Sequence, residues 1–196
     1  MDSGITALPL TDFLADPVSG RIVLDRLHSL LGEHKRILVW GPRVGAIELA
    51  EDLLMLWPNE GEIVAVNAGA LCTRTRQDTQ DSEWVQWVET DALTLLEETM
   101  DRKPKGIVVL YANQTIGPAL PKLLDGTWGF VTAVDASSAA EAREKFARLA
   151  GKEAERLDVM IGLSEAGKST FISEVTSVAG GASQRVVGLD HGKYVT

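Results

Sequence analysis

Residues 36–57, with the sequence RILVWGPRVGAIELAEDLLMLW, decide the fold of this chain. They begin with the apolar run 37–40, which is typical of a buried parallel strand. Gly41 and Gly45 then interrupt the run, and the apolar residues that follow recur at helical spacing until Pro58 ends the segment. In nucleotide-binding α/β proteins, a strand, a glycine-bearing turn and a helix in this order place a phosphate group against the helix N-terminus.

The turn between this strand and helix lacks the groups that hold phosphate. A phosphate loop has the pattern Gly-x4-Gly-Lys-Ser/Thr, in which backbone amides and the lysine contact the phosphates and the hydroxyl binds magnesium. Here Pro42 removes an amide donor, no lysine or hydroxyl follows Gly45, and the Glu48 carboxylate would repel phosphate. The sequence therefore predicts the scaffold of a nucleotide site without its reactive side chains.

Composition and charge narrow the class of protein. With 196 residues, 45% hydrophobic content and a net charge of −9, the chain fits one globular domain with an acidic surface, which disfavours general binding to nucleic acid. Its single cysteine, Cys72, and its isolated histidines predict neither a disulfide nor a metal site. Because no apolar run approaches the roughly 20 residues of a membrane span, we expect a cytoplasmic protein without direct membrane insertion.

The rest of the chain alternates between predicted helices and strands. We interpret residues 1–20 as a loosely held lead-in, residues 73–83 as an exposed loop and residues 21–196 as one domain. The predicted helices cover residues 21–34, 47–57, 90–102, 115–124 and, behind a capping box at Ser138, 138–150. The predicted strands cover residues 37–40, 62–66, 84–88, 107–112, 129–134, 157–163, 170–178 and 184–189. This order predicts an α/β fold with a mainly parallel sheet flanked by helices and a C-terminal antiparallel β extension.

The order and the local sequence of these elements resemble the motor domain of the type II/type IV secretion ATPases, the family that drives pilus assembly, archaellum rotation and conjugative transfer. The resemblance covers residues 21–189. It is carried by RILVWG with LAEDLLMLWPNEGEIVAV, by ALTLLEETMDRKPKGIVVLYANQ, by GTWGFVTAVDASSAAEAREKFARLAG and by the hairpin-like LDVMIGLSEAGKSTFISEVTSVAGG. The resemblance implies a RecA-like fold and, within the family, ATP hydrolysis in a ring.

This sequence departs from the family where the family binds and splits nucleotide. The phosphate loop lacks its Lys-Thr pair, and the acidic pair, the Walker B glutamate and the histidine box are each replaced. The vestigial positions are Gly41, Arg43 and Gly45 in the phosphate loop, Asn67 in the acidic pair, Tyr111 in Walker B and Asp135 in the histidine box. The resemblance therefore implies a pseudo-ATPase, with no cofactor, that acts as a scaffold or regulatory subunit through protein–protein contacts.

The partners that the resemblance implies are proteins. They are an active paralogous ATPase in a mixed ring, or the inner-membrane components of a secretion or pilus machine. Either a homo-oligomer or a hetero-oligomer fits this interpretation. The expected location is the cytoplasm, with peripheral attachment at the inner membrane through these partners.

A second motif keeps an enzyme alternative open. Residues 162–169 (GLSEAGKS) match the phosphate-loop pattern, and in this alternative Gly162, Gly167, Lys168 and Ser169 bind Mg-ATP, either in an active NTPase or in a nucleotide-binding switch without turnover. However, a phosphate loop normally precedes the strand that supplies the Walker B carboxylate, and the residues after this motif are rich in strand-forming Thr, Val and Ile. We therefore predict a hairpin turn between two antiparallel strands.

Overall fold

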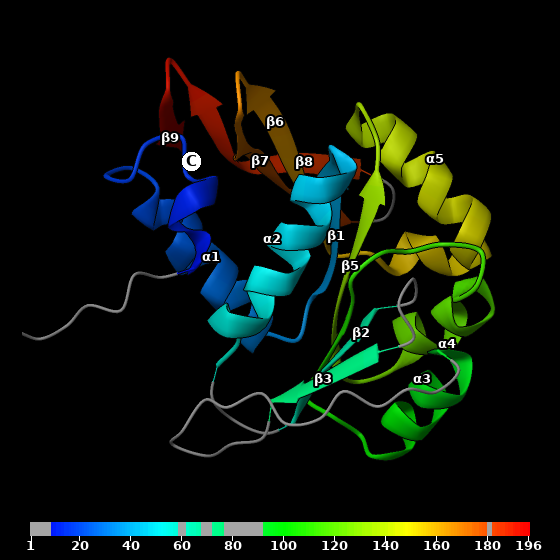
Figure 1. The fold of residues 1–196 in the computed structure, drawn as a ribbon. Coiled ribbons are helices and arrows are strands. Elements are labelled where there is room, and N and C mark those ends of the chain that lie inside the picture. The colour runs from blue at the N-terminus through cyan, green and yellow to red at the C-terminus, as the bar shows by residue number, and fades with distance from the viewer. Residues whose placement is uncertain (1–8, 59–61, 68–71, 77–91, 180–181) are drawn as a thin grey trace, which may run out of the picture.

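The computed structural model describes residues 9–58, 62–67, 72–76, 92–179 and 182–196, which form one nine-stranded sheet with helices on both faces (Figure 1). The strand order is β3-β2-β4-β5-β1-β6-β7-β8-β9. The strands are β1 (Arg36–Gly41), β2 (Ile63–Asn67), β3 (Cys72–Arg76), β4 (Gly106–Val109), β5 (Gly129–Asp135), β6 (Val159–Ala166), β7 (Ser169–Ala179), β8 (Ala182–Asp190) and β9 (Lys193–Val195). The helices are η1 (Pro9–Phe13), α1 (Arg21–Gly32), α2 (Arg43–Leu56), α3 (Ala92–Asp101), η2 (Gly117–Ala119), α4 (Leu120–Asp125), α5 (Ala139–Ala150) and η3 (Gly151–Arg156).

The centre of the sheet is parallel and both of its sides are antiparallel. β2, β4, β5, β1 and β6 run in the same direction, and β6 to β9 then form an antiparallel meander. This arrangement confirms the predicted fold class. At the opposite edge of the sheet, β3 pairs antiparallel with β2, and the sequence did not predict this strand.

Alternation along the central strand β1 divides the core into two layers. Ile37 and Val39 pack with α1 and α2, whereas Leu38 and Trp40 pack on the opposite face with α3, α4 and α5. All four residues are buried, because a parallel strand covered by helices on both faces has no solvent side. This explains why the apolar run at residues 37–40 is continuous.

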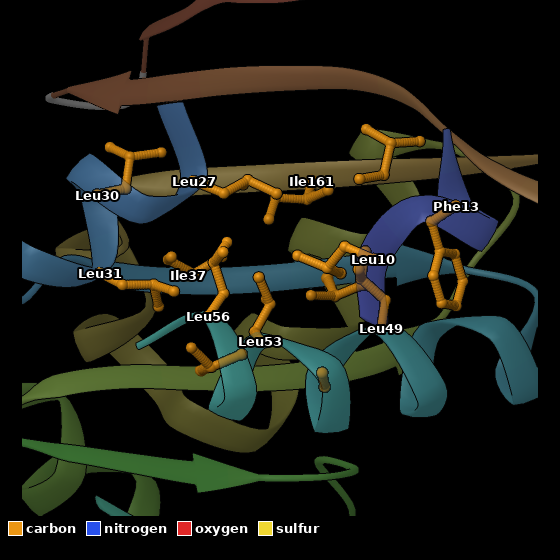
Figure 2. Packing of buried hydrophobic residues seen from close by; sticks show 14 of the residues in the cluster. Leu10, Phe13, Leu27, Leu30, Leu31, Ile37, Leu49, Leu53, Leu56 and Ile161 are labelled. Atoms are coloured by element: carbon orange, nitrogen blue, oxygen red, sulfur yellow. The ribbon is translucent and has the colours of Figure 1, made fainter. Parts of the chain in front are cut away.

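The segment before α1 is part of the core rather than a loosely held lead-in. Leu10, Phe13 and Leu14 are buried, and Figure 2 shows Leu10 and Phe13 of η1 in the same cluster as Leu49 of α2 and Ile161 of β6. The expectation for residues 1–20 is therefore wrong for residues 9–20. A single turn of 3₁₀ helix is too short to show a periodic pattern, so its burial leaves no clear signal in the sequence.

Tyr194 of β9 joins this N-terminal segment to the meander. Its hydroxyl accepts a hydrogen bond from the Ala15 amide at 3.0 Å and donates one to the Ile172 carbonyl of β7 at 2.8 Å. The Tyr194 amide donates to the Ser19 hydroxyl at 2.9 Å. The N-terminal segment, β7 and β9 are thus connected through one buried side chain.

Most of the remaining predicted elements are present, with three corrections. Residues 73–76 belong to β3 instead of an exposed loop, because pairing with β2 satisfies their backbone groups without an apolar pattern. The strand predicted over 107–112 ends at Val109, and the helix predicted over 115–124 is reduced to η2 and α4. The predicted strand at 84–88 and the rest of the predicted loop, 77–83, lie outside the described residues.

None of the helices in the described parts of the chain combines the length and apolarity that a bilayer crossing requires.

Candidate functional site

The carboxyl ends of β1 and β5 form the switch point of the sheet. β1 leads into α2 on one face, and β5 leads into α5 on the other face. The two strands pair in parallel, and their last residues, Gly41 and Asp135, are partners in the register. Open α/β sheets bind their ligands in the crevice at such a position. This edge is therefore the candidate functional site.

The vestigial phosphate loop is a short connection. β1 ends at Gly41, Pro42 is the N-cap of α2, and the helix begins at Arg43. Pro42 has no N–H, and no side chain caps the helix start. A Cβ atom on Gly45 would lie 2.6 Å from Cγ2 of Thr170, so β7 packs directly against the first turn of α2. Gly45 thus permits close packing of the hairpin, where a phosphate loop would leave space for phosphate.

Besides Gly41 at the end of β1, three further vestigial positions lie at the switch point. The guanidinium carbon of Arg43 lies 4.7 Å from the centre of the Tyr111 ring, which is a cation–π contact. Tyr111 follows the end of β4, which lies next to β5 and therefore to Asp135. Asn67 ends β2 at the same edge of the sheet but is separated from β1 by β4 and β5. The structure brings Arg43, Tyr111 and Asp135 together and leaves Asn67 further out.

Side chains of α5 complete the site on the far side of Asp135. The Lys145 ammonium donates to the Asp135 carbonyl at 2.8 Å and forms an ion pair with Glu141 at 2.8 Å. Hydrogen bonds from Lys145 and from Ser137 lower the pKa of the Glu141 carboxyl to about 2, and the Glu141 contact raises the pKa of Lys145. Both groups are therefore charged at neutral pH. Arg148, one turn further along α5, forms an ion pair with Glu144.

Two cavities flank Asp135. One, of about 420 Å³, lies between the β1–α2 connection and β6 and is lined by Pro42, Ser137, Ser164 and Glu165, among others. The other, of about 310 Å³, lies between the segment after β4 and α5. The first cavity is the one beside the vestigial loop, and the Glu165 carboxylate of β6 lines it. Because this carboxylate repels anions, the cavity is poorly suited to phosphate.

The second phosphate-loop pattern is a β-hairpin, as the sequence predicted. Glu165 pairs with Thr170 and Ala166 with Ser169, so Gly167 and Lys168 form a two-residue turn between β6 and β7. Gly167 has a φ of +66°, the left-handed conformation that hairpin turns of this length favour. Ser169 begins a strand instead of a helix, so the strand–loop–helix geometry that concentrates amides on phosphate is absent at this turn.

Lys168 lies beside carboxylates. It lines a cavity of about 570 Å³ together with Asp12 of η1 and Glu48 and Asp52 of α2. Partial burial, with repulsion from neighbouring carboxylates, raises the pKa of Asp52 to about 6. A triphosphate at this cavity would be repelled by these carboxylates. Among the described residues, no group of three or more His, Cys, Asp or Glu side chains is arranged to hold a metal ion.

Sequence reasoning identified one side of this site and missed the other. It singled out Gly41, Arg43, Tyr111 and Asp135, all of which lie at the switch point. It overlooked Lys145 and Arg148, because charged residues on an amphipathic helix resemble an ordinary solvated face. The available signal was their i, i+3 spacing, which places both side chains on one face of α5.

The fold resembles that of bacterial ATPases of known structure. Neither the protein-family models nor the curated proteins give a match to this chain. Among solved structures, the VirB11 ATPase of the Brucella suis type IV secretion system, in complex with sulphate, matches with a TM-score of 0.58 and 16% identity, over 89% of this chain and 59% of VirB11. The Legionella pneumophila ATPase DotB matches with a TM-score of 0.52 and 14% identity, over 80% of this chain and 49% of DotB.

At these identities the likeness shows the fold: a RecA-like α/β sheet of the kind found in type IV secretion ATPases. The chain spans less than two thirds of the length of either neighbour.

Proposed function

We propose that this protein is a non-catalytic relative of the secretion and pilus-assembly ATPases that acts as a scaffold or regulatory subunit. The observation that carries the proposal is the closed β1–α2 connection, where Thr170 packs against Gly45. In the nucleotide-binding arrangement, a loop with free amides, a lysine and a hydroxyl occupies this position. Pro42 at the N-cap and the absence of a lysine or hydroxyl after Gly45 support the same conclusion.

The other reactive positions support loss of catalysis in the same way. Tyr111 stands where the family's Walker B glutamate is expected, and its ring is covered by the Arg43 guanidinium. Asp135 stands at the histidine-box position, and Asn67 at the acidic pair. In this proposal the site has no Mg-ATP cofactor and no catalytic residue.

The proposed partners are proteins. An active paralogous ATPase in a mixed ring, or an inner-membrane component of a secretion or pilus machine, would use the RecA-like framework as a docking surface. The protein would then be cytoplasmic and attached peripherally to the inner membrane through its partner. A homo-oligomer and a hetero-oligomer both fit this role, and size measurement with and without the partner distinguishes them.

Isothermal titration with Mg-ATP, alongside a phosphate-release assay, tests the loss of catalysis. We expect no binding heat and no hydrolysis above the buffer blank, whereas an active secretion ATPase treated identically shows both. Affinity capture from cells that express a secretion or pilus machine should recover one of its components. Hydrolysis by the pure protein that a single substitution abolishes would overturn the proposal.

The enzyme alternative at residues 162–169 has its own test. In that alternative, Lys168 contacts the β and γ phosphates and Ser169 binds magnesium. Lys168→Ala would then remove nucleotide binding, whereas we expect it to leave the response to Mg-ATP unchanged. A nucleotide-binding switch without turnover would instead show as thermal stabilisation by Mg-ATP that Lys168→Ala removes.

A further inference from the structure

The 310 Å³ cavity beside Asp135 has the composition of a ligand site. It lies at the carboxyl edge of β4 and β5, on the α5 side of the sheet, and its size falls in the range of small-molecule pockets. Its lining combines polar and charged side chains with apolar ones. The lining residues that matter here are Tyr111, Asn113, Asp135, Lys145, Arg148 and Leu149.

Two uncharged lining side chains have hydrogen-bond donors without a partner among the described residues. Asn113 accepts hydrogen bonds at Oδ1 from the amides of Thr115, at 2.9 Å, and Ile116, at 3.3 Å, which fixes the orientation of its side chain and leaves the Nδ2 donors available. The Tyr111 hydroxyl has no hydrogen-bond partner in the described parts of the chain. The Arg43 guanidinium over the Tyr111 ring holds the aromatic side chain in place.

Two cations of α5 line the cavity, each ion-paired with a glutamate of the same helix, and both keep unused N–H donors. Lys145 uses two of its three donors, on the Asp135 carbonyl and on Glu141. Arg148 contacts Glu144 and retains further N–H donors of its guanidinium. The two glutamates lie on α5 but do not line the cavity, whereas both cations do. Among the described residues that line the cavity, Asp135 is the one carboxylate.

The cavity wall also has an apolar part. Ala112 and Val134 are almost fully buried, and Leu149 is partly buried and packs against the same core cluster. A ligand that fits this composition carries a negative head for the donors and cations and a short apolar body for the wall.

We propose that this cavity binds a small organic anion, a carboxylate or phosphate monoester with a ring-sized apolar body. Tyr111, Asn113, Lys145 and Arg148 hold the anionic head, and Leu149 with its apolar neighbours covers the body. This site lies on the α5 side of Asp135, whereas the 420 Å³ cavity lies on the side of Pro42. This binding site is separate from the proposed scaffold function. Its test does not depend on that function, because the pocket can be present with or without ATPase activity.

Titration of the ¹⁵N-labelled protein with phenyl phosphate and, separately, with benzoate tests the site by NMR. We expect saturable shifts of the amides around residues 111–113 and 145–149, with a dissociation constant on the order of 1 mM for at least one of the two probes. The stronger probe identifies the head group. Phenol, which has the ring without the charge, should cause no saturable shift.

Substitutions connect binding to the named side chains. Arg148→Gln should weaken the better probe about tenfold or more, and Tyr111→Phe about three- to tenfold. The matched control is Lys152→Gln, which removes one positive charge from an exposed side chain outside the cavity and should leave the constant unchanged. Shifts at residues 162–169 without shifts at 111–113 and 145–149, no binding of either probe up to about 10 mM, or equal loss in the control would overturn the proposal. Inorganic phosphate binding as tightly as the organic probes would also overturn it.

Discussion

Gly41 at the end of β1 and Leu163 of β6 lie so close together that a Cβ atom on Gly41 would stand 2.6 Å from the Cβ of Leu163. Gly41 also has a φ of +149°, a conformation that residues with a side chain rarely adopt. The close approach of Leu163 and the positive φ therefore each favour glycine at position 41. Neither depends on a nucleotide.

Gly41→Ala should lower the free energy of unfolding by about 3 kcal/mol, from overpacking together with backbone strain. Gly167→Ala is the matched control. Gly167 also has a positive φ, but nothing lies within 4 Å of its added Cβ, so the loss should be about 1 kcal/mol, from backbone conformation alone. Urea denaturation of both variants measures the difference. Equal losses would show that contact with Leu163 contributes nothing.

Tyr194→Phe should lower the free energy of unfolding by about 1–3 kcal/mol, because the Ala15 amide and the Ile172 carbonyl lose their partner inside the protein. Hydrogen exchange of residues 10–20 should accelerate in the same variant. Tyr111→Phe removes a hydroxyl with no partner in the described residues and should change stability by less than about 0.5 kcal/mol. Equal stability of the two variants would show that the hydrogen bonds of the Tyr194 hydroxyl contribute nothing to the free energy of unfolding.

Asp52→Asn should stabilise the protein at neutral pH. The pKa of Asp52 is raised from 3.8 to about 6, first by burial and then by Glu51, Glu48 and Asp12, so the folded protein binds this proton more strongly than the unfolded chain. Stability therefore decreases as pH rises from about 4 to 6. At pH 7 the gain from Asp52→Asn should be about 1 kcal/mol, after allowance for solvent screening of a half-exposed group.

At pH 4 the same variant should show no gain over the wild type, because the Asp52 carboxyl is then mostly protonated in the folded protein. Thermal unfolding from pH 4 to pH 7.5 measures the whole curve. Glu98→Gln, which changes an exposed carboxylate on α3, is the control and should give no comparable gain. A gain from Asp52→Asn that is constant across this range would exclude titration as its cause.

Ser138→Ala should destabilise the protein by about 1 kcal/mol, because the Ser138 hydroxyl accepts a hydrogen bond from the Glu141 amide at the start of α5. Ser138→Gly should cost only a few tenths of a kcal/mol, since glycine is itself a favourable N-cap. Circular dichroism during urea titration distinguishes the two. A glycine variant less stable than the alanine variant would contradict the capping role.

The central strands and the α5 cap could be predicted because their signals are local. A strand buried on both faces shows as an unbroken apolar run, as in β1, and the Ser138 cap lies three residues before its partner Glu141. β3 could not be predicted, because its stability comes from pairing with β2 and its own residues, CTRTR, have no apolar pattern.

The candidate site was predictable only in part for a related reason. Gly41 and Arg43 are next to a strong strand signal, so their place at the sheet edge follows from the order of elements. Lys145 reaches Asp135 across ten residues of sequence and only after α5 has packed on the sheet, which no short window of sequence encodes. The contact between Thr170 and Gly45, through which the meander packs on α2, also joins residues far apart in sequence and could not be predicted from a short window.

The position of β1 between β5 and β6 pairs it with strands that lie far along the chain. The meander from β6 to β9 joins neighbours in sequence, whereas the Arg36 amide of β1 reaches the Asp158 carboxylate 122 residues away. Contacts between distant residues form slowly, because a long loop has to close before they gain any energy. Enclosing the middle strand of the sheet therefore requires the closure of long loops, whereas the C-terminal meander needs only short ones.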